Sequence, residues 1–211
     1  MSCCVNTVAK RMKRLGVASV VHRKFRVTTT DSKHDRPVFE NRLGRDFAAE
    51  APDRKWAADI TYVPTGEGWL YLAGVIDLHS RKLVGWSMAN HMRAERVADA
   101  LAMALARRSP GAGLPHHGDR GVQYAGDDYQ GLLAEHGITC SMSNKGDCYD
   151  NAAMESFWAT LKTERVHHER YATREQARAS VFEYIEVFYN RKRLHSALGY
   201  LSPEQFEAGL N

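Results

Sequence analysis

The sequence predicts an α/β fold in which helices cover a mixed five-stranded sheet. Three strand-like runs joined by short polar turns come first, between residues 55 and 88. Helical and strand-like patterns then alternate through residues 93–142, and helical patterns follow. An antiparallel meander followed by alternating helices and strands is typical of one sheet with helices packed on it.

The meander is predicted from alternating residues and from turn residues. In residues 55–64, KWAADITYVP, alternation places Trp56, Ala58, Ile60 and Tyr62 on one side of the sheet. Asp59 then faces the other side. The turn PTGEG ends this strand. Two mostly apolar runs follow as the second and third strands: WLYLAGVID at residues 69–77 and LVGWSM at residues 83–88.

Helices are predicted where apolar residues recur at spacings of three and four between capping residues and glycines. Asp150 or Asn151 is expected to cap one of them by accepting backbone N–H bonds. Two capping boxes are expected further on, Thr173 with Gln176 and Ser202 with Gln205. The predicted helices span residues 93–108, 127–136, 151–167 and 173–190, and a short one begins at 203. Two short strands are predicted between these helices, at 114–119 and 138–142.

Basic residues gather towards the N-terminus. Residues 1–58 hold 13 Lys and Arg against 6 Asp and Glu, whereas residues 59–211 hold 16 against 19. A short amphipathic helix is predicted from Val5 to Leu15. Its basic residues are Lys10, Arg11, Lys13 and Arg14. Such a cluster can replace the counterions condensed on nucleic acid, although a solvated basic arm has the same composition.

Composition excludes several classes of protein. The chain is 44% hydrophobic and 26% charged, and no apolar run approaches the roughly 20 residues that span a bilayer. Its start lacks the apolar middle of a secretion signal, which indicates a cytoplasmic protein without a membrane partner. Four cysteines lack zinc-binding spacing and are expected to be free thiols: Cys3, Cys4, Cys140 and Cys148.

Three carboxylates are candidates for one metal site. Asp59 lies within the first strand, Asp119 ends the short strand LPHHGD, and Glu155 lies about one turn inside a helix. If the first and fourth strands are neighbours, the two aspartates approach each other, and the helix brings Glu155 and Lys162 over them. Carboxylate oxygens without nearby His or Cys suit Mg²⁺ or Mn²⁺, and two such ions can promote phosphodiester displacement.

Each acid taken alone has a plainer explanation. Asp59 can be a solvent-facing strand residue, Asp119 part of a turn, and Glu155 an acid favoured by the helix dipole. The metal-site interpretation therefore rests on spacing, since 35 residues lie between Asp119 and Glu155, and on the local sequence around each acid.

Four stretches carry that local sequence: WAADITYV, HHGDRGVQY, SMSNKGDCYDNAAMESFWATLK and YNRKRLHSALGYLSP. Together they resemble the integrase-core transposases of bacterial insertion sequences, of the OrfB type, over roughly residues 53–208. The resemblance implies a ribonuclease H-like fold, similar to that of retroviral integrase, and a DDE triad on Asp59, Asp119 and Glu155. It also implies metal-dependent cleavage of transposon ends and strand transfer, with two Mg²⁺ (or Mn²⁺) ions held by the three acids.

The same resemblance implies partners. These are DNA, as transposon ends and target, a homo-oligomer assembled on paired ends, and a partner protein from an upstream reading frame. It also implies a place on the bacterial nucleoid. Candidate DNA contacts are Lys162, Arg120, Gln123, Lys145, Arg191, Lys192 and Arg193, together with the four basic residues of the N-terminal helix.

Two features depart from the family pattern. Gly118 stands where a serine usually precedes the second acid, and we expect it to loosen the backbone beside Asp119. Residues 1–26 resemble a truncated helix-turn-helix, which is followed by a linker at 27–52 and the integrase catalytic core at 53–211. Two rival functions therefore stay open: a ribonuclease H-like nuclease that only hydrolyses, and a decayed transposase that binds DNA without cutting it.

Overall fold

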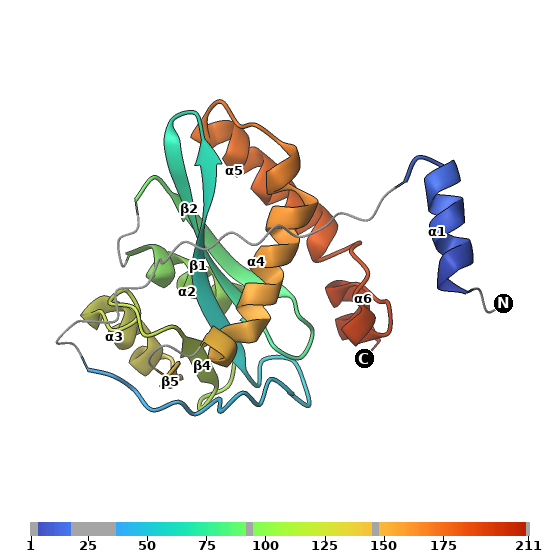
Figure 1. Ribbon diagram of the computed structural model, residues 1–211. Coiled ribbons are helices and arrows are strands. Elements are labelled where there is room, and N and C mark those ends of the chain that lie inside the picture. The colour runs from blue at the N-terminus through green and yellow to red at the C-terminus, as the bar shows by residue number, and fades with distance from the viewer. Residues whose placement is uncertain (1–3, 18–36, 92–94, 145–147, 210–211) are drawn as a thin grey trace.

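The computed structural model describes residues 4–17, 37–91, 95–144 and 148–209 (Figure 1). Five strands form one sheet in the order β3-β2-β1-β4-β5. Their bounds are β1 Trp56–Thr65, β2 Gly68–Asp77, β3 Leu83–Ala89, β4 Pro115–Gly118 and β5 Thr139–Met142. The α/β fold and its five strands are confirmed.

The sheet changes direction at its centre. β1, β2 and β3 form the antiparallel meander, whereas β4 and β5 run parallel to β1. The first and fourth strands are therefore neighbours, which is the condition that the metal-site hypothesis needed. Ligand sites in α/β sheets tend to lie where the strand connections reverse, and β1 and β4 meet at such a point.

Six α-helices are present among the described residues: α1 Val5–Arg14, α2 Glu95–Arg108, α3 Asp127–Glu135, α4 Ala152–Glu164, α5 Arg174–Glu183 and α6 Pro203–Ala208. One predicted end is wrong. α4 stops at Glu164 because Arg165 leaves helical geometry (φ −129°), which turns Val166 into the core. The helix predicted to Asn190 does continue to Tyr189, but α5 becomes a π-helix at Tyr184–Tyr189, where the Asn190 N–H donates to the carbonyl of Ile185.

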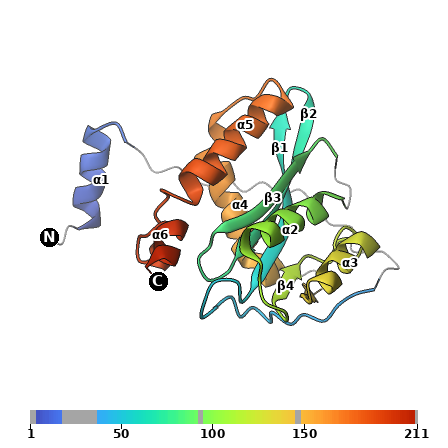
Figure 2. The same ribbon diagram turned by 180° about the vertical axis from the view of Figure 1, so that it is seen from behind.

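The helices cover both faces of the sheet. α4 lies on the face towards the viewer in Figure 1, and α2 lies on the face towards the viewer in Figure 2. The alternation of β1 divides the core accordingly. Ala57 packs in the cluster with Trp158 of α4, whereas Trp56 and Ala58 pack in the cluster with Leu101 of α2. The predicted facing of Trp56 and Ala58 is confirmed.

Residues 37–52 contain no helix or strand, yet they pack on the core. Leu43 is buried, and the backbone N–H groups of Arg42 and Leu43 donate to Ser141 Oγ on β5 (2.9 and 3.3 Å). Figure 1 shows this blue segment running along the end of the sheet that holds β4 and β5. The part of the expected linker that the structure describes is thus fastened to the core. No residue of α1 is buried.

Helix α2 approaches the sheet closely at one glycine. A Cβ added at Gly85 of β3 would clash with the carbonyl oxygen of Ala100 and lie 2.8 Å from Ala104 Cβ. These are atoms of the α2 backbone and of a one-carbon side chain, so they cannot move aside without shifting the helix. Gly131 of α3 is the contrast, since a Cβ there meets nothing within 4 Å.

We predict that Gly85→Ala lowers the free energy of unfolding by about 1–3 kcal/mol or more, because it overpacks a rigid contact. The control Gly131→Ala should raise it by about 0.5–1 kcal/mol, because alanine favours the helix and restricts the unfolded chain. Urea denaturation measures both. Equal stability of Gly85→Ala and the parent chain would contradict the close helix–sheet contact.

Candidate active site

Asp59 lies in the middle of β1 and faces α4. The backbone N–H of Ile60 donates to Asp59 Oδ1 (2.8 Å), and the indole N–H of Trp158 donates to Oδ2 (3.0 Å). Each carboxylate oxygen therefore has one fixed donor and keeps a further lone pair. Strand and helix together hold this carboxylate in one orientation.

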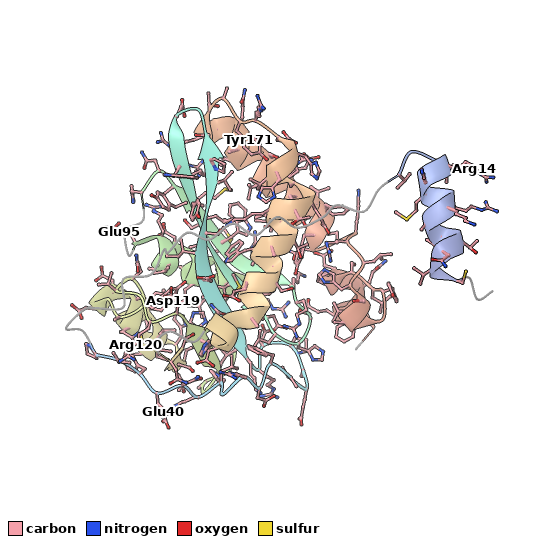
Figure 3. All side chains as sticks on the ribbon, in the orientation of Figure 1. Arg14, Glu40, Glu95, Asp119, Arg120 and Tyr171 are labelled. Carbon is pink, nitrogen blue, oxygen red and sulfur yellow. The ribbon has the colours of Figure 1, made fainter. Side chains whose placement is uncertain are left out.

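Asp119 directly follows β4. The β1–β4 ladder pairs Trp56 with His116 and Ala57 with His117, and the same offset two residues further on brings position 59 level with position 119. The Asp119 carboxylate turns back to accept the N–H of Gly121 (2.8 Å). Figure 3 marks Asp119 beside β1.

Glu155 belongs to the first turn of α4 and is exposed. Burial, the negative charge of Asp119 and then that of Glu155 raise the pKa of Asp59 to about 8. The three predicted acids therefore act on one another electrostatically at the meeting point of β1, β4 and α4. Burial also raises the pKa of Glu155.

The donor set suits a hard cation. The neighbouring acids supply oxygen, and the two histidines of β4 are buried and engaged elsewhere. Oxygen ligands without nitrogen or sulfur favour Mg²⁺ or Mn²⁺. In the described part of the chain, no three His, Cys, Asp or Glu side chains are closed into metal-ligand geometry. Neighbouring carboxylates repel one another, which opposes such closure by the protein alone.

Lys162 lies on the face of α4 that carries Trp158. Its ammonium is 4.8 Å from the centre of the Tyr62 ring on β1. Burial lowers the pKa of Lys162, while the negative charge of Asp59 opposes that shift. A cation is thus held near the acids by an aromatic ring on the sheet.

A buried hydrogen-bond chain fixes the strand that leads to Asp119. Ser141 Oγ accepts two backbone N–H bonds, so its own hydrogen goes to His117 Nδ1 (2.8 Å). His117 Nε2 then carries the proton and donates to Ser143 Oγ (3.1 Å). Burial lowers the pKa of His117 to about 4 and that of His116 to about 3, so both imidazoles are neutral.

The expectation that Gly118 loosens the backbone beside Asp119 is wrong. Gly118 belongs to β4, pairs with Met142 of β5, and its carbonyl accepts the N–H of Ser143 (3.0 Å). A Cβ at this position would lie 3.0 Å from Cδ1 of the buried Tyr124 ring. Glycine here therefore lets that ring pack against the strand.

The expected cap of α4 is not formed. The Asn151 side chain instead donates to the carbonyl of Ala58 beside Asp59 (3.0 Å). Asp150 accepts from the backbone N–H of Asn144 (2.8 Å) and from two side chains of the packed segment, Asn41 and Arg45 (2.9 and 3.1 Å). Both residues fasten the start of α4 to its surroundings. Of the two expected capping boxes, the one at Ser202 forms in full. In the other, Thr173 accepts the Gln176 N–H as expected, but the Gln176 side chain accepts from the backbone N–H of Ala172 and not from that of Thr173.

The predicted DNA contacts have different surroundings. Gln123 is buried, and Arg193 forms a forked ion pair with Glu164 (2.7 and 2.9 Å). Arg191 and Lys192 are exposed, as are the four basic residues of α1. Arg120 is half-buried, and Lys145 lies outside the described residues.

Sequence reasoning missed two parts of the site. The hydrogen bond from Trp158 to Asp59 could have been found from the spacing of three between Glu155 and Trp158 on one helix face. The anchoring of α4 through Asp150 and Asn151 had no local signal, because the partners Asn41, Arg45 and Ala58 are 93 to 109 residues away in the chain.

Family models match most of the chain. A model described as the integrase core domain matches residues 49–148, and a second with the same description matches residues 155–209. The chain is 52% identical over 203 residues to the transposase InsF for insertion sequence IS3A of Escherichia coli strain K12, which covers 96% of this chain and 70% of that protein. It is 49% identical over 199 residues to an uncharacterized 31 kDa protein of insertion element IS600 from Shigella sonnei, with 94% and 73% covered.

Solved structures share the fold at low sequence identity. A simian T-cell lymphotropic virus intasome, solved in complex with the PP2A regulatory subunit B56 gamma, matches with a TM-score of 0.64 and 15% identity. That match covers 84% of this chain and 60% of the viral one. The HTLV-2 integrase catalytic core domain in complex with magnesium matches with a TM-score of 0.57 and 13% identity, covering 76% and 99%.

The sheet order and the helices on its two faces define a ribonuclease H-like, integrase-type core. The chain belongs to the IS3-type insertion-sequence transposases, whose catalytic part is an integrase core domain. Its function is that of a DDE transposase, a polynucleotidyl transferase of transposition and DNA integration. Transposases and integrases bind DNA and act as oligomers. No helix in the described ranges is long and apolar enough to cross a membrane.

The buried histidines predict a loss of stability in mild acid. Their folded pKa values, about 3 for His116 and about 4 for His117, lie below the ~6.5 of an unfolded histidine, so the unfolded chain binds protons first as the pH falls. Stability is therefore fully present above pH ~6.5 and is lost below it. At pH 5 each histidine should cost about 2 kcal/mol of unfolding free energy relative to neutral pH.

Urea denaturation at pH 7.5 and pH 5 tests this. His117→Gln should remove about half of the loss of unfolding free energy that the two histidines cause between pH 7.5 and pH 5. This holds even if the substitution itself changes stability at pH 7.5. The exposed His136→Gln serves as control and should keep the full pH dependence. An unchanged pH dependence in His117→Gln would contradict a neutral, buried imidazole.

Proposed function

We propose that this transposase cuts the ends of a transposon and joins the freed 3′-hydroxyl to target DNA at a site formed by Asp59, Asp119 and Glu155. The observation that carries the proposal is the approach of the three acids where β1, β4 and α4 meet, with Trp158 of α4 bonded to Asp59. There burial, together with the charges of Asp119 and Glu155, raises the pKa of Asp59 to about 8. Perturbed acids gathered at a point where the strand connections reverse are typical of catalytic centres.

The three carboxylates would hold divalent metal, and Mg²⁺ or Mn²⁺, as two ions, fits their oxygen donors best. Bound there, the metal would supply positive charge to the attacking and leaving oxygens of a phosphodiester. A magnesium complex of the HTLV-2 integrase core, which has the same fold, supports this assignment. The reaction needs no covalent bond between protein and DNA, since water and then the 3′-hydroxyl act as nucleophiles.

The residues around the acids would orient them. Trp158 and the Ile60 N–H fix both oxygens of Asp59, and Asn151 ties the start of α4 to the strand beside that residue. Lys162, held over Tyr62, would contact a phosphate of the DNA. A carboxylate held by both strand and helix keeps the same direction when neighbouring charge changes.

The partners follow from the chemistry. Transposon ends and target DNA are the substrates, and we infer a homo-oligomer that brings two ends together. A partner protein from an upstream reading frame would complete end recognition. The exposed basic residues of α1 and of the chain after α5 would bind DNA backbone. Binding to chromosomal DNA would place the protein on the nucleoid.

Strand transfer from a pre-cut end tests the proposal most sharply. The chain with Mg²⁺ should join a pre-cut 3′-end to target DNA, a product that a purely hydrolytic nuclease or a decayed transposase cannot form. Asp59→Asn, Asp119→Asn and Glu155→Gln should each lower the rates of joining and cleavage by more than about 100-fold. Replacing a residue that only hydrogen-bonds a metal ligand already lowers metal affinity or activity by about 10- to 100-fold, so replacing a ligand should cost more.

DNA binding should persist in all three variants, which separates loss of chemistry from loss of substrate. The exposed Asp128→Asn on α3 removes one negative charge away from the acids and should keep full activity. Strand transfer that survives in any of the three site variants would refute the assigned role of that acid.

A further inference from the structure

A second, basic pocket lies on another side of α4. It has a volume of about 380 Å³ and is formed by the first turns of α4, the β2–β3 turn at Arg81, and the chain from Arg193 to Ala197. None of its lining residues is one of the three acids, Trp158 or Lys162. The pocket is thus separate from the carboxylate site although both use α4.

The charge of this pocket is positive. Its lining includes Arg81, Arg193 and His195 and no aspartate or glutamate. Arg193 is neutralised by its forked pair with Glu164 (2.7 and 2.9 Å). The Arg81 side chain has no hydrogen bond or ion pair with any described residue, although the charge of Asp77 acts on it from nearby. Its N–H donors are therefore available to an anion.

The fold fixes Arg81 at this place. Its backbone is left-handed (φ +60°), an unusual conformation for a residue with a side chain. Its N–H donates to the carbonyl of Asp77 (2.9 Å), and its own carbonyl accepts from the Tyr189 hydroxyl (3.0 Å). The Asp77 carboxylate accepts hydrogen bonds from the backbone N–H groups of Asp53 and Ser80 and from the Ser80 hydroxyl. It forms no ion pair with Arg81 among the described contacts.

His195 adds a second group without a partner. Its Nε2 atom is buried and has no hydrogen-bond partner within the part of the chain that the structure describes. The ring is held edge-on against Tyr189, with the centroids 4.9 Å apart, and its backbone N–H donates to the carbonyl of Leu201 (3.1 Å). Buried polar atoms are normally paired, so an unpaired nitrogen beside an unpaired guanidinium indicates a missing acceptor.

We propose that this pocket binds a backbone phosphate of DNA, with Arg81 and His195 Nε2–H as donors. A guanidinium presents a planar fork that suits phosphate oxygens, and the positive end of α4 adds to the attraction. The volume exceeds that of a phosphate ion and includes an apolar wall with Phe47 and Leu194, which would face the adjoining sugar. The inference rests on the proposed function only for the source of the phosphate.

Two measurements on the full chain test the proposal. In the first, thermal unfolding is followed in inorganic phosphate and in chloride at equal ionic strength. Phosphate should raise the melting temperature of the parent chain and leave that of Arg81→Gln unchanged, because a ligand stabilises the state that binds it. Arg170→Gln, which removes an exposed arginine outside the pocket, should respond like the parent.

In the second, binding of a labelled DNA duplex is titrated at several salt concentrations. Arg81→Gln should raise the Kd about tenfold and reduce the slope of log Kd against log salt by about 0.9, the value for one lost phosphate contact. Arg81→Lys should recover part of the DNA affinity and part of the salt slope. Arg170→Gln should change the Kd and the slope less than Arg81→Gln does. Melting temperatures in chloride show whether each variant is folded.

The outcomes separate this inference from the proposed function. If Arg81→Gln matches Arg170→Gln in both measurements, the pocket proposal is overturned, whatever the result of strand transfer. If Arg81→Gln loses phosphate stabilisation but keeps the DNA affinity and salt slope, the assignment to DNA is overturned. If both effects appear while strand transfer fails, the phosphate pocket stands and the proposed chemistry falls.

Discussion

The contact between α4 and the centre of the sheet determines the rest of the site. Trp158 reaches the sheet because Gly74 of β2 has no side chain, and a Cβ there would lie 2.8 Å from the end of the indole. From this position the indole N–H donates to Asp59 (3.0 Å), and the first turn of the same helix carries Glu155. Apolar packing of one ring therefore sets the distance between a strand acid and a helix acid.

The same arrangement has an electrostatic cost. Burial and the charges of two neighbours disfavour the ionised form of Asp59, as its raised pKa shows. The surrounding fold compensates with neutral donors at Asp59 and with tight packing beneath the acids, where Tyr124 lies against Gly118. The ionised acids are unfavourable here unless positive charge is bound, and the fold holds them rigidly. Such a site is suited to bind cations together with phosphates.

The sequence predicts the sheet and the placement of its acids well, because the two-residue period of β1 decides which face each side chain occupies. Asp59 had to lie opposite Trp56 and Ala58 once those residues entered the core. That β1 and β4 are neighbours was only a supposition from the sequence, because no local pattern sets the order of strands in a sheet. Glu155 could be placed near the aspartates only by the resemblance to a family, since local pattern does not say where a helix packs.

Other features depend on distant contacts that no local pattern encodes. The π-helix at Tyr184–Tyr189 buries Tyr184, Ile185 and Tyr189, and the helical pattern of the sequence gives no sign of its wider turn. Asn151 is a residue type that often caps helices, but its side chain donates to the carbonyl of Ala58, 93 residues away on β1. Arg193 belongs to a basic cluster in the sequence, whereas in the fold Glu164 neutralises it.

Anomalous diffraction from crystals grown with Mn²⁺ shows whether the three acids form one metal site. If they do, manganese density lies in contact with carboxylate oxygens of Asp59 and Asp119, and Glu155 turns towards the same ions. Density bound elsewhere, or none between these acids at saturating Mn²⁺, would contradict that single site.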